Sequence, residues 1–471
     1  MGKKIFIKNF SYVMLSNLFS LVISSIIVLI IPHFAGEKVY SYYQLENLYC
    51  SYLWVFSIGW LQGLYIKYGG ISREKLMDDN IAWQLVLLVT YSVLLLSLML
   101  LITNAIVFQT EEKKTVFILS VISISIELLM NGLKYLLQAV NDMKSFSISI
   151  ILDRGIYICI VIACLFASHI NYVILISIDL LSKLIALIYL LIQTRDFYKF
   201  KQVNLKDAFQ KTEEAIKIGI SVELASYLRT LINSIVQVSI EWTFGVITFG
   251  KVSLTLSISN MFTKFVAAIS TVLFPVLRNT STEKQEKLYS IMATILRTVL
   301  LGAFIGYLPL KLLLGIWLPN YKESLHFLAI LLPVSLYETK VTMLNNTYLK
   351  TIRQEKKILL SNVMTVLVSI LVSFVSVYIL KSLELAMLGI VFMLAFRSML
   401  EEHFLEKYMR IQTGMFPEII MTIIFIVFSW GIDGWIGMLG YAICYIGYLW
   451  IQKKEILQAV MYLKNEGEIR T

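Results

Sequence analysis

The stretch VSLTLSISNMFTKFVAAISTVLFPVL, residues 252–277, decides the fold class of this sequence. It is long enough to cross the hydrocarbon core of a bilayer as a helix, which takes about 20 apolar residues. Its single charged residue is Lys264, near the middle. A charge at that depth costs about 2.5–3.5 kcal/mol even on the milder insertion scales, so this lysine needs a structural or functional reason.

Apolar stretches of the same kind recur along the whole chain. Of its 471 residues, 58% are hydrophobic and 15% are charged. The longest polar segment is about twenty residues, around 195–217, which leaves no room for a separate catalytic domain. The sequence therefore predicts an all-α polytopic membrane protein with about fourteen membrane helices. They are predicted at 11–34, 42–66, 81–103, 115–140, 147–168, 172–193, 217–240, 246–276, 289–312, 325–349, 358–380, 385–405, 416–431 and 434–451.

Lysines and arginines are concentrated in the loops on one side of these helices. By the positive-inside rule, that side and both termini are predicted to be cytoplasmic. The net charge of +10 is mostly this topology signal and does not indicate nucleic-acid binding. The domains predicted from this pattern are an N-lobe at 1–196, a cytoplasmic basic linker at 197–216, a C-lobe at 217–408, and the last two helices with a cytoplasmic tail at 409–471.

Motifs for catalysis and metal binding are missing from the sequence. There is no Walker A, HExxH, paired CxxC or GxSxG pattern, and the four histidines show no ligand spacing. The four cysteines lie in apolar runs, which disfavours disulfides. We therefore expect a protein that is not an enzyme, with no catalytic residues, no metal and no cofactor.

Three predicted helices carry polar stripes. Residues three or four positions apart share one face of a helix, and buried polar faces in membranes usually line a cavity or meet a partner. The stripe of 115–140 comprises Glu127, Asn131, Lys134 and Gln138; that of 217–240 comprises Glu223, Ser226, Thr230, Asn233 and Gln237, with Arg229 beside it; and that of 246–276 comprises Ser253, Ser257, Asn260 and Lys264.

Facing stripes predict a hydrated central cavity between the lobes. Because basic residues outnumber acidic ones at mid-depth, the cavity is expected to prefer an anion. The predicted substrate-binding cations are Arg229, Lys264, Lys134, Arg154, Arg297, Lys340 and Arg397, and the predicted neutral cavity residues are Asn131, Asn233, Asn260 and Ser257. The acidic residues Glu127, Glu223 and Glu338 are candidates for coupling to H⁺ or Na⁺.

Each charge also has a purely structural interpretation. Asp179 and Lys183 have the i, i+4 order that favours an ion pair, and this interpretation is preferred over a substrate site. For Arg229 and Lys264 cavity lining is preferred, with an interhelical ion pair to a carboxylate as the alternative. Snorkelling to the headgroups is expected for Glu46, Glu241 and Lys251, which lie near the outer boundary.

Four segments of the chain resemble polysaccharide flippases of the Wzx type, in the MOP superfamily, which also contains MATE and MurJ transporters. In this sequence they read PHFAGEKVYSYYQLENLYCSYLWVFSIGWLQGLYIKYGG (32–70), FGKVSLTLSISNMFTKFVAAISTVLFPVLR (249–278), WLPNY (317–321) and NNTYLKTIRQEKK (345–357). Together with the number of predicted helices, the resemblance covers essentially the whole chain.

The resemblance implies a transport function. It implies two six-helix lobes that alternate access, with helices thirteen and fourteen bordering a groove for a lipid tail. The implied substrate is an oligosaccharide on a polyprenyl diphosphate, moved from the inner to the outer leaflet of a bacterial cytoplasmic membrane. Implied partners are the bilayer, a polysaccharide polymerase and other assembly proteins. No family motif assigns a role to Lys264 or Arg229.

Two other functions stay open at this point. A MATE-like cation-coupled exporter of small molecules has the same fold, although a cavity rich in lysine and arginine disfavours organic cations. A membrane polysaccharide polymerase or ligase is disfavoured because the predicted external loops are short.

Overall fold

The computed structural model describes residues 2–78, 81–166, 170–198, 205–278, 282–409, 415–432 and 434–468. These ranges contain helices and turns and no β-strand, which confirms the predicted all-α fold. Nine of the described helical spans are long and apolar enough to cross a membrane. The number becomes ten if the bent pair Pro319–His326 and Leu328–Thr351 is one span. The protein is therefore a multi-pass membrane protein.

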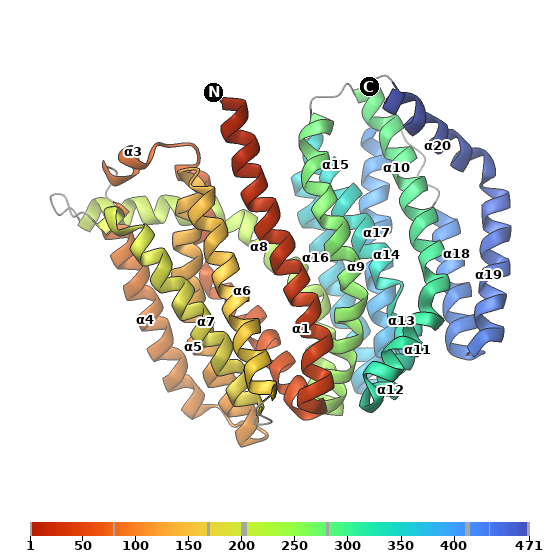
Figure 1. Cartoon of the computed structure of the whole chain (residues 1–471), viewed down its shortest axis with the longest axis horizontal. Coiled ribbons are helices and arrows are strands. Elements are labelled where there is room, and N and C mark those ends of the chain that lie inside the picture. The colour runs from red at the N-terminus through yellow and green to blue at the C-terminus, as the bar shows by residue number, and fades with distance from the viewer. Residues whose placement is uncertain are drawn as a thin grey trace. The chain divides into compact units, whose positions relative to one another are not determined.

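The chain divides into two compact units (Figure 1), unit 1 at Met1–Thr230 and unit 2 at Leu231–Thr471. The division falls inside one long helix, α8 (Leu205–Phe244). The described part of the predicted linker 197–216 belongs to unit 1. The lobe boundaries predicted from the sequence stay a prediction.

Unit 1 contains most of the helices that the sequence predicts for the first half of the chain. They are α1 (Gly2–Leu53), η1 (Trp54–Ser57), α2 (Trp60–Tyr68), α3 (Arg73–Asp78), α4 (Ile81–Ala105), α5 (Glu111–Ala139), α6 (Met143–Phe166), α7 (Tyr172–Gln193), η2 (Arg195–Tyr198) and the first part of α8. The predicted helix 172–193 has the same limits as α7.

The second predicted helix, 42–66, is broken in the structure. Residues up to Leu53 continue α1, which turns at Gly36, where φ is +81°. After η1 the chain passes through Ile58 and Gly59, both with left-handed φ, before α2 begins. Left-handed backbone is readily adopted by glycine and interrupts a helix.

Helix α8 crosses the chain at this break, and its backbone is in direct contact with that of Gly59 and Gly63. A Cβ atom on Gly63 would lie 1.8 Å from the carbonyl oxygen of Ala215, and one on Gly219 would lie 2.0 Å from that of Gly59. Any side chain at Gly63 or Gly219 would therefore push the two helices apart. The first part of α8 is fixed against α2 by this contact.

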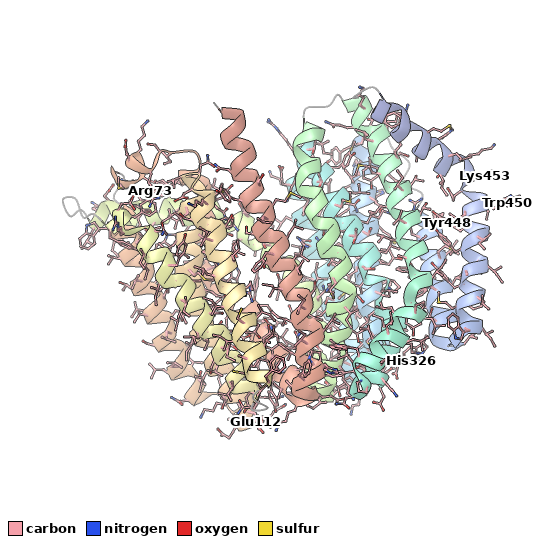
Figure 2. All side chains as sticks on the ribbon, in the orientation of Figure 1. Arg73, Glu112, His326, Tyr448, Trp450 and Lys453 are labelled. Carbon is pink, nitrogen blue, oxygen red and sulfur yellow. The ribbon has the colours of Figure 1, made fainter. Side chains whose placement is uncertain are left out.

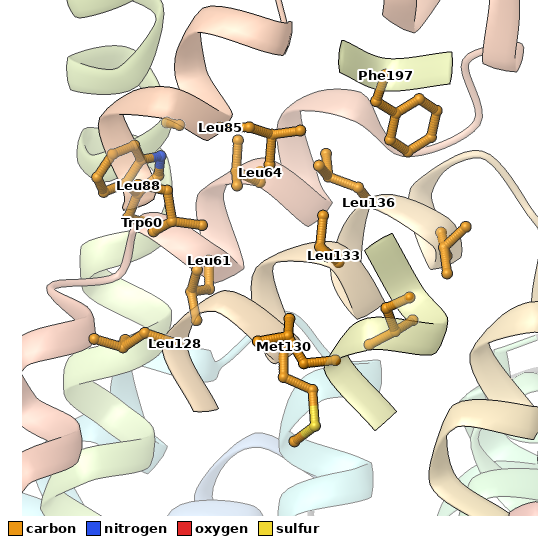
Figure 3. Packing of buried hydrophobic residues seen from close by; sticks show 14 of the residues in the cluster. Trp60, Leu61, Leu64, Leu85, Leu88, Leu128, Met130, Leu133, Leu136 and Phe197 are labelled. Atoms are coloured by element: carbon orange, nitrogen blue, oxygen red, sulfur yellow. The ribbon is translucent and has the colours of Figure 1, made fainter. Parts of the chain in front are cut away.

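The hydrophobic core of unit 1 is formed mainly by α2, α4 and α5. Figure 3 shows its leucines packed between Met130 at one edge and Phe197 of η2 at another. The labelled residues are Trp60, Leu61 and Leu64 of α2, Leu85 and Leu88 of α4, and Leu128, Met130, Leu133 and Leu136 of α5. This core holds the charged face of α5 in place.

Unit 2 contains the remaining helices, several of them interrupted. They are α9 (Val246–Arg278), α10 (Thr282–Ala303), η3 (Phe304–Gly306), α11 (Tyr307–Trp317), η4 (Pro319–Tyr321), α12 (Lys322–His326), α13 (Leu328–Leu331), α14 (Val334–Lys340), η5 (Val341–Asn345), α15 (Asn346–Thr351), α16 (Glu355–Ser373), η6 (Phe374–Ile379), α17 (Leu383–Met409), α18 (Met415–Ile426), η7 (Val427–Gly431), α19 (Gly434–Ile451) and α20 (Lys453–Glu468). The predicted helix 325–349 is divided into short pieces, and Pro333, which lacks an N–H, lies between α13 and α14.

The helices predicted at 416–431 and 434–451 are both present, as α18 with η7 and as α19. Two tyrosines hold α19 against α10: Tyr441 donates a hydrogen bond to the Leu301 carbonyl and Tyr445 donates one to the Thr298 carbonyl, both at 2.8 Å. Helix α20 was not predicted. It contacts α10, where Lys287 lies 4.8 Å from the ring centre of Tyr462.

Candidate functional site

Charged side chains of unit 1 gather in one buried cluster, centred on Lys183 of α7. The Lys183 ammonium lies 2.7 Å from Glu127 of α5 and 2.5 Å from Asp179, and it donates to the Ser123 hydroxyl at 2.8 Å. Lys183 and Asp179 are each 4% exposed. The ion pair predicted between them is confirmed.

Helices α6 and α1 add to this cluster. Arg154 of α6 lies 3.6 Å from Asp153 and 3.5 Å from Asp179. Glu46 of α1 is buried and accepts a hydrogen bond from the Cys50 thiol at 3.2 Å. The expectation that Glu46 snorkels to headgroups is wrong, because the part of α1 after Gly36 packs inside unit 1.

Lys134 of α5 belongs to the same cluster but is bound differently. It is buried, and its electrostatic neighbours are the carboxylates Asp153 and Glu127 and the cations Arg154 and Lys183. Among the residues that the structure describes, no carboxylate lies within the 4.0 Å of an ion pair from its ammonium. Asn131 and Gln138, on the same face of α5, are half-buried beside it. Lys134 therefore has N–H donors that are not bound to a described carboxylate, whereas those of Lys183 are bound to Glu127, Asp179 and Ser123.

We name this cluster the unit 1 network. It contains the carboxylates Glu46, Glu127, Asp153 and Asp179 and the cations Lys134, Arg154 and Lys183. Carboxylates outnumber cations by one, and burying an unbalanced charge is costly.

Unit 2 has a second buried cluster, built around Glu418 of α18. Glu418 accepts hydrogen bonds from Arg297 of α10 at 2.6 Å and from Lys340 of α14 at 2.5 Å. Lys340 also contacts Glu402 of α17. All four side chains are at most 4% exposed. One carboxylate therefore ties α18 to α10 and α14.

Arg397 of α17 extends this cluster and is completely buried. Its Nε lies 3.3 Å from Glu401, and its Nη1 lies 4.0 Å from Glu338 of α14. Ser361 donates to Glu401 at 2.9 Å, and Ser398 donates to Glu402 at 3.2 Å. We name the set the unit 2 network: Glu338, Glu401, Glu402 and Glu418 with Arg297, Lys340 and Arg397.

The structure thus pairs most of the cations that the sequence assigns to substrate binding. Arg154, Arg297, Lys340 and Arg397 each form at least one ion pair inside their own unit. Sequence reasoning did not single out Glu401, Glu402 and Glu418. They lie near the ends of α17 and α18, where carboxylates resemble ordinary interfacial residues.

The remaining predicted residues are spread over α8 and α9. On α8, Glu223 is buried near Tyr135, Arg229 is exposed and Asn233 is half-buried. On α9, Ser257 and Asn260 are half-buried, and Thr339 contacts Thr263 at 3.4 Å. The side chain of Lys264 lies outside the described residues. Convergence of these residues on one cavity stays a prediction.

A third charged cluster lies at one end of unit 1 and joins α3, η2 and the turn before α6. Arg73 binds both carboxylate oxygens of Asp196, at 2.7 and 2.8 Å, and one oxygen of Asp142 at 3.0 Å. Its guanidinium carbon lies 5.0 Å from the ring centre of Phe197. The hydrogen bonds to Asp196 raise the pKa of Arg73. Figure 2 places Arg73 at the opposite end of unit 1 from Glu112.

Comparison with known proteins identifies the fold. No protein-family model matches the sequence, and no curated protein matches it. Among solved structures, the lipid II flippase MurJ in an inward closed conformation is similar over 96% of this chain and 100% of that chain, with a TM-score of 0.66 and 13% identity. An inward-facing multidrug resistance MATE family transporter of the MOP superfamily is similar over 84% of this chain and 94% of that chain, with a TM-score of 0.61 and 14% identity. At these identities the likeness establishes fold, so the chain is a multi-pass membrane protein with the fold of MurJ and MATE transporters.

Proposed function

We propose that this protein is a flippase that moves polyprenyl-diphosphate-linked oligosaccharide from the inner to the outer leaflet of a bacterial cytoplasmic membrane. It works by alternating access, with both termini cytoplasmic, and supplies surface polysaccharide biosynthesis. The main supporting observation is coverage: the similarity to the MurJ lipid II flippase takes in 96% of this chain, against 84% for the MATE transporter. The longer match leaves room for α18 and α19, the helices expected to border a lipid tail.

The anchoring of these two helices fits that role. Glu418 joins α18 to Arg297 and Lys340, and the hydrogen bonds of Tyr441 and Tyr445 join α19 to α10. A tail groove on these helices would then move with unit 2 during transport. This coupling is useful for a flippase because the tail must stay in lipid while the head group crosses.

The head group needs cations and hydrogen-bonding side chains along its path. A diphosphate gains charge-assisted hydrogen bonds from lysine and arginine, and sugar hydroxyls pair with amides and hydroxyls. Lys134 has no direct carboxylate partner among the described side chains, and Arg229 is exposed. We therefore assign first contact with the diphosphate to Lys134, Arg229 and Lys264. The paired cations Arg154, Arg297, Lys340 and Arg397 hold the two networks together and bind substrate secondarily.

The carboxylates of the two networks are suited to coupling transport to an ion gradient. Each network has one more carboxylate than cations, so each can bind H⁺ or Na⁺ without creating unbalanced positive charge. Glu127 belongs to the unit 1 network and Glu338 to the unit 2 network, while Glu223 is buried near Tyr135. We propose that one of these sites exchanges its ion during each transport cycle.

The test is export of surface polysaccharide in a strain that lacks this gene. Wild-type protein and the exposed-site control Lys453→Ala should restore export, whereas Lys134→Ala, Arg229→Ala and Lys264→Ala should leave lipid-linked repeat units on the inner leaflet. Membrane insertion of each variant is checked by its abundance in the membrane fraction. Accumulation of the repeat units on the outer leaflet would instead support the polymerase or ligase.

A MATE-like exporter is the second candidate, because the similarity to the MATE transporter extends over 94% of that protein. Binding assays with organic cations and with polyprenyl diphosphate separate the two functions. Binding of the organic cation alone would replace the flippase proposal.

A further inference from the structure

Unit 1 contains a groove that the proposed transport path does not use. It lies between the first turns of α8, the first half of α4 and the break before α2, and its volume is about 970 Å³. Its floor is apolar and includes Trp60, Leu87, Leu94 and Phe209. Charged residues of α8 form its rim.

The floor of the groove lies at the depth of lipid tails. A helix rises about 1.5 Å per residue, so Leu87 and Leu94 lie about 9 and about 20 Å along α4 from its first residue, Ile81. Helix α4 is long and apolar enough to cross a membrane, and the hydrocarbon core of a bilayer is about 30 Å thick, so the floor follows a stretch of α4 at the level of acyl chains. The occupant of this floor must be an extended apolar chain.

The rim lies at the polar end of the unit. The Lys67 ammonium, near the end of α2, donates to the carboxylate of Glu214 at 2.8 Å and to the Lys211 carbonyl at 3.1 Å. The Lys67 hydrogen bond lowers the pKa of Glu214, so this carboxylate is ionised at neutral pH. The rim therefore holds charged side chains next to the apolar floor of the same groove.

The charges of the rim select the kind of headgroup. Its charged residues are two lysines, Lys206 and Lys217, and two glutamates, Glu213 and Glu214. Lys217 and Glu213 form an exposed i, i+4 pair at 2.6 Å. An exposed pair of this kind is screened by solvent and contributes little to stability, so it opens readily to a ligand. The lysines can bind a phosphate and the glutamates can bind an amine, whereas the glutamates would repel an anionic headgroup.

We propose that this groove binds one phospholipid with a zwitterionic, primary-amine headgroup. The phosphate lies beside Lys206 and Lys217, the amine beside Glu213, and one acyl chain follows the floor along α4. On its other side, α8 meets α2 backbone to backbone through Ala215 and Gly219. The lipid fills the space on the α4 side and fixes the position of α8. This inference does not depend on the transported substrate.

The test is the lipid that remains with the full chain after detergent purification, measured by mass spectrometry. Leu94→Trp fills the floor. Leu98→Trp is the matched control, because Leu98 is an exposed leucine one turn further along α4 and outside the groove lining. Wild type and L98W should retain equimolar phosphatidylethanolamine, and L94W about tenfold less, which corresponds to a loss of about 1.4 kcal/mol. Equal retention in L94W and L98W would overturn the proposal.

A second variant keeps the proposal testable if L94W does not fold. Glu213→Lys removes the carboxylate assigned to the amine and leaves the floor intact. For wild type, added phosphatidylethanolamine should raise the midpoint of thermal unfolding more than added phosphatidylglycerol, and E213K should reverse this order. An equal shift with both lipids in wild type, or the same order in E213K, would contradict the assigned headgroup.

Discussion

The two buried networks have the same charge composition but different surroundings. Each combines three cations with four carboxylates. In the unit 2 network every ion-paired side chain is at most 9% exposed, whereas in the unit 1 network the side chains of Arg154 and Glu127 are 30% and 21% exposed. Lys134 in unit 1 also has no direct carboxylate partner among the described side chains.

This difference in exposure indicates that the two networks have different roles. A sealed network cannot exchange ions or meet a substrate without opening, so the unit 2 network is best suited to holding α18 in place. The unit 1 network is more exposed and contains Lys134, which has no direct carboxylate partner among the described side chains, so it is better suited to binding. The following substitutions test this comparison.

The largest effect on stability is expected for Glu418→Ala. It leaves Arg297 and Lys340 buried without their shared carboxylate, and breaking a buried ion pair in this way costs about 3–5 kcal/mol. The measurement is the unfolding free energy in detergent, with Glu455→Ala on the exposed face of α20 as the control. A loss for E418A below that of typical surface substitutions, about 0.5 kcal/mol, would show that the unit 2 network does not anchor α18.

A smaller loss is expected for Lys183→Met in unit 1. It removes the partner of Glu127 and Asp179, but the unit 1 network is more exposed than the unit 2 network, which limits the cost to about 2–3 kcal/mol. The measurement is again the unfolding free energy in detergent. A loss for K183M as large as that for E418A would show that the greater exposure of the unit 1 network has no energetic effect.

A still smaller loss is expected for Arg73→Ala. The ion pairs of Arg73 with Asp142 and Asp196 are partly exposed, with about a third of the Arg73 side chain accessible. Solvent screening keeps the expected loss near 1 kcal/mol. Arg73→Lys is the informative control, since lysine cannot form the two-pronged contact with Asp196 and should restore only part of the stability. Full recovery in R73K would show that charge alone matters at this end of unit 1.

The sequence was sufficient to predict what depends on hydropathy and local spacing. The limits of α7 and the ion pair of Asp179 with Lys183 both follow from the residues of a single helix. The break at Ile58 and Gly59 was missed because glycine is common in membrane helices and the surrounding run is apolar throughout.

The composition of the networks could not be predicted, because it depends on which helices are neighbours. Glu418 gains its importance from Arg297 and Lys340, which lie 121 and 78 positions away in the chain. The same holds for Glu46, whose burial follows from the packing of α1. The sequence shows the polar stripe on α5. It does not show that Lys183 pairs with carboxylates while Lys134 has no direct carboxylate partner among the described side chains.

Lys134 is proposed to bind the head group of a lipid-linked oligosaccharide that the protein moves across the membrane. The most direct measurement is translocation of a polyprenyl-diphosphate-linked oligosaccharide in proteoliposomes containing wild type or Lys134→Met. Because Lys134 forms no ion pair with the side chains that the structure describes, K134M should keep its unfolding free energy within about 1 kcal/mol of wild type. Translocation should fall at least about tenfold, equivalent to about 1.4 kcal/mol of lost binding. Wild-type translocation by a stable K134M, or no translocation by the wild-type protein, would contradict the account.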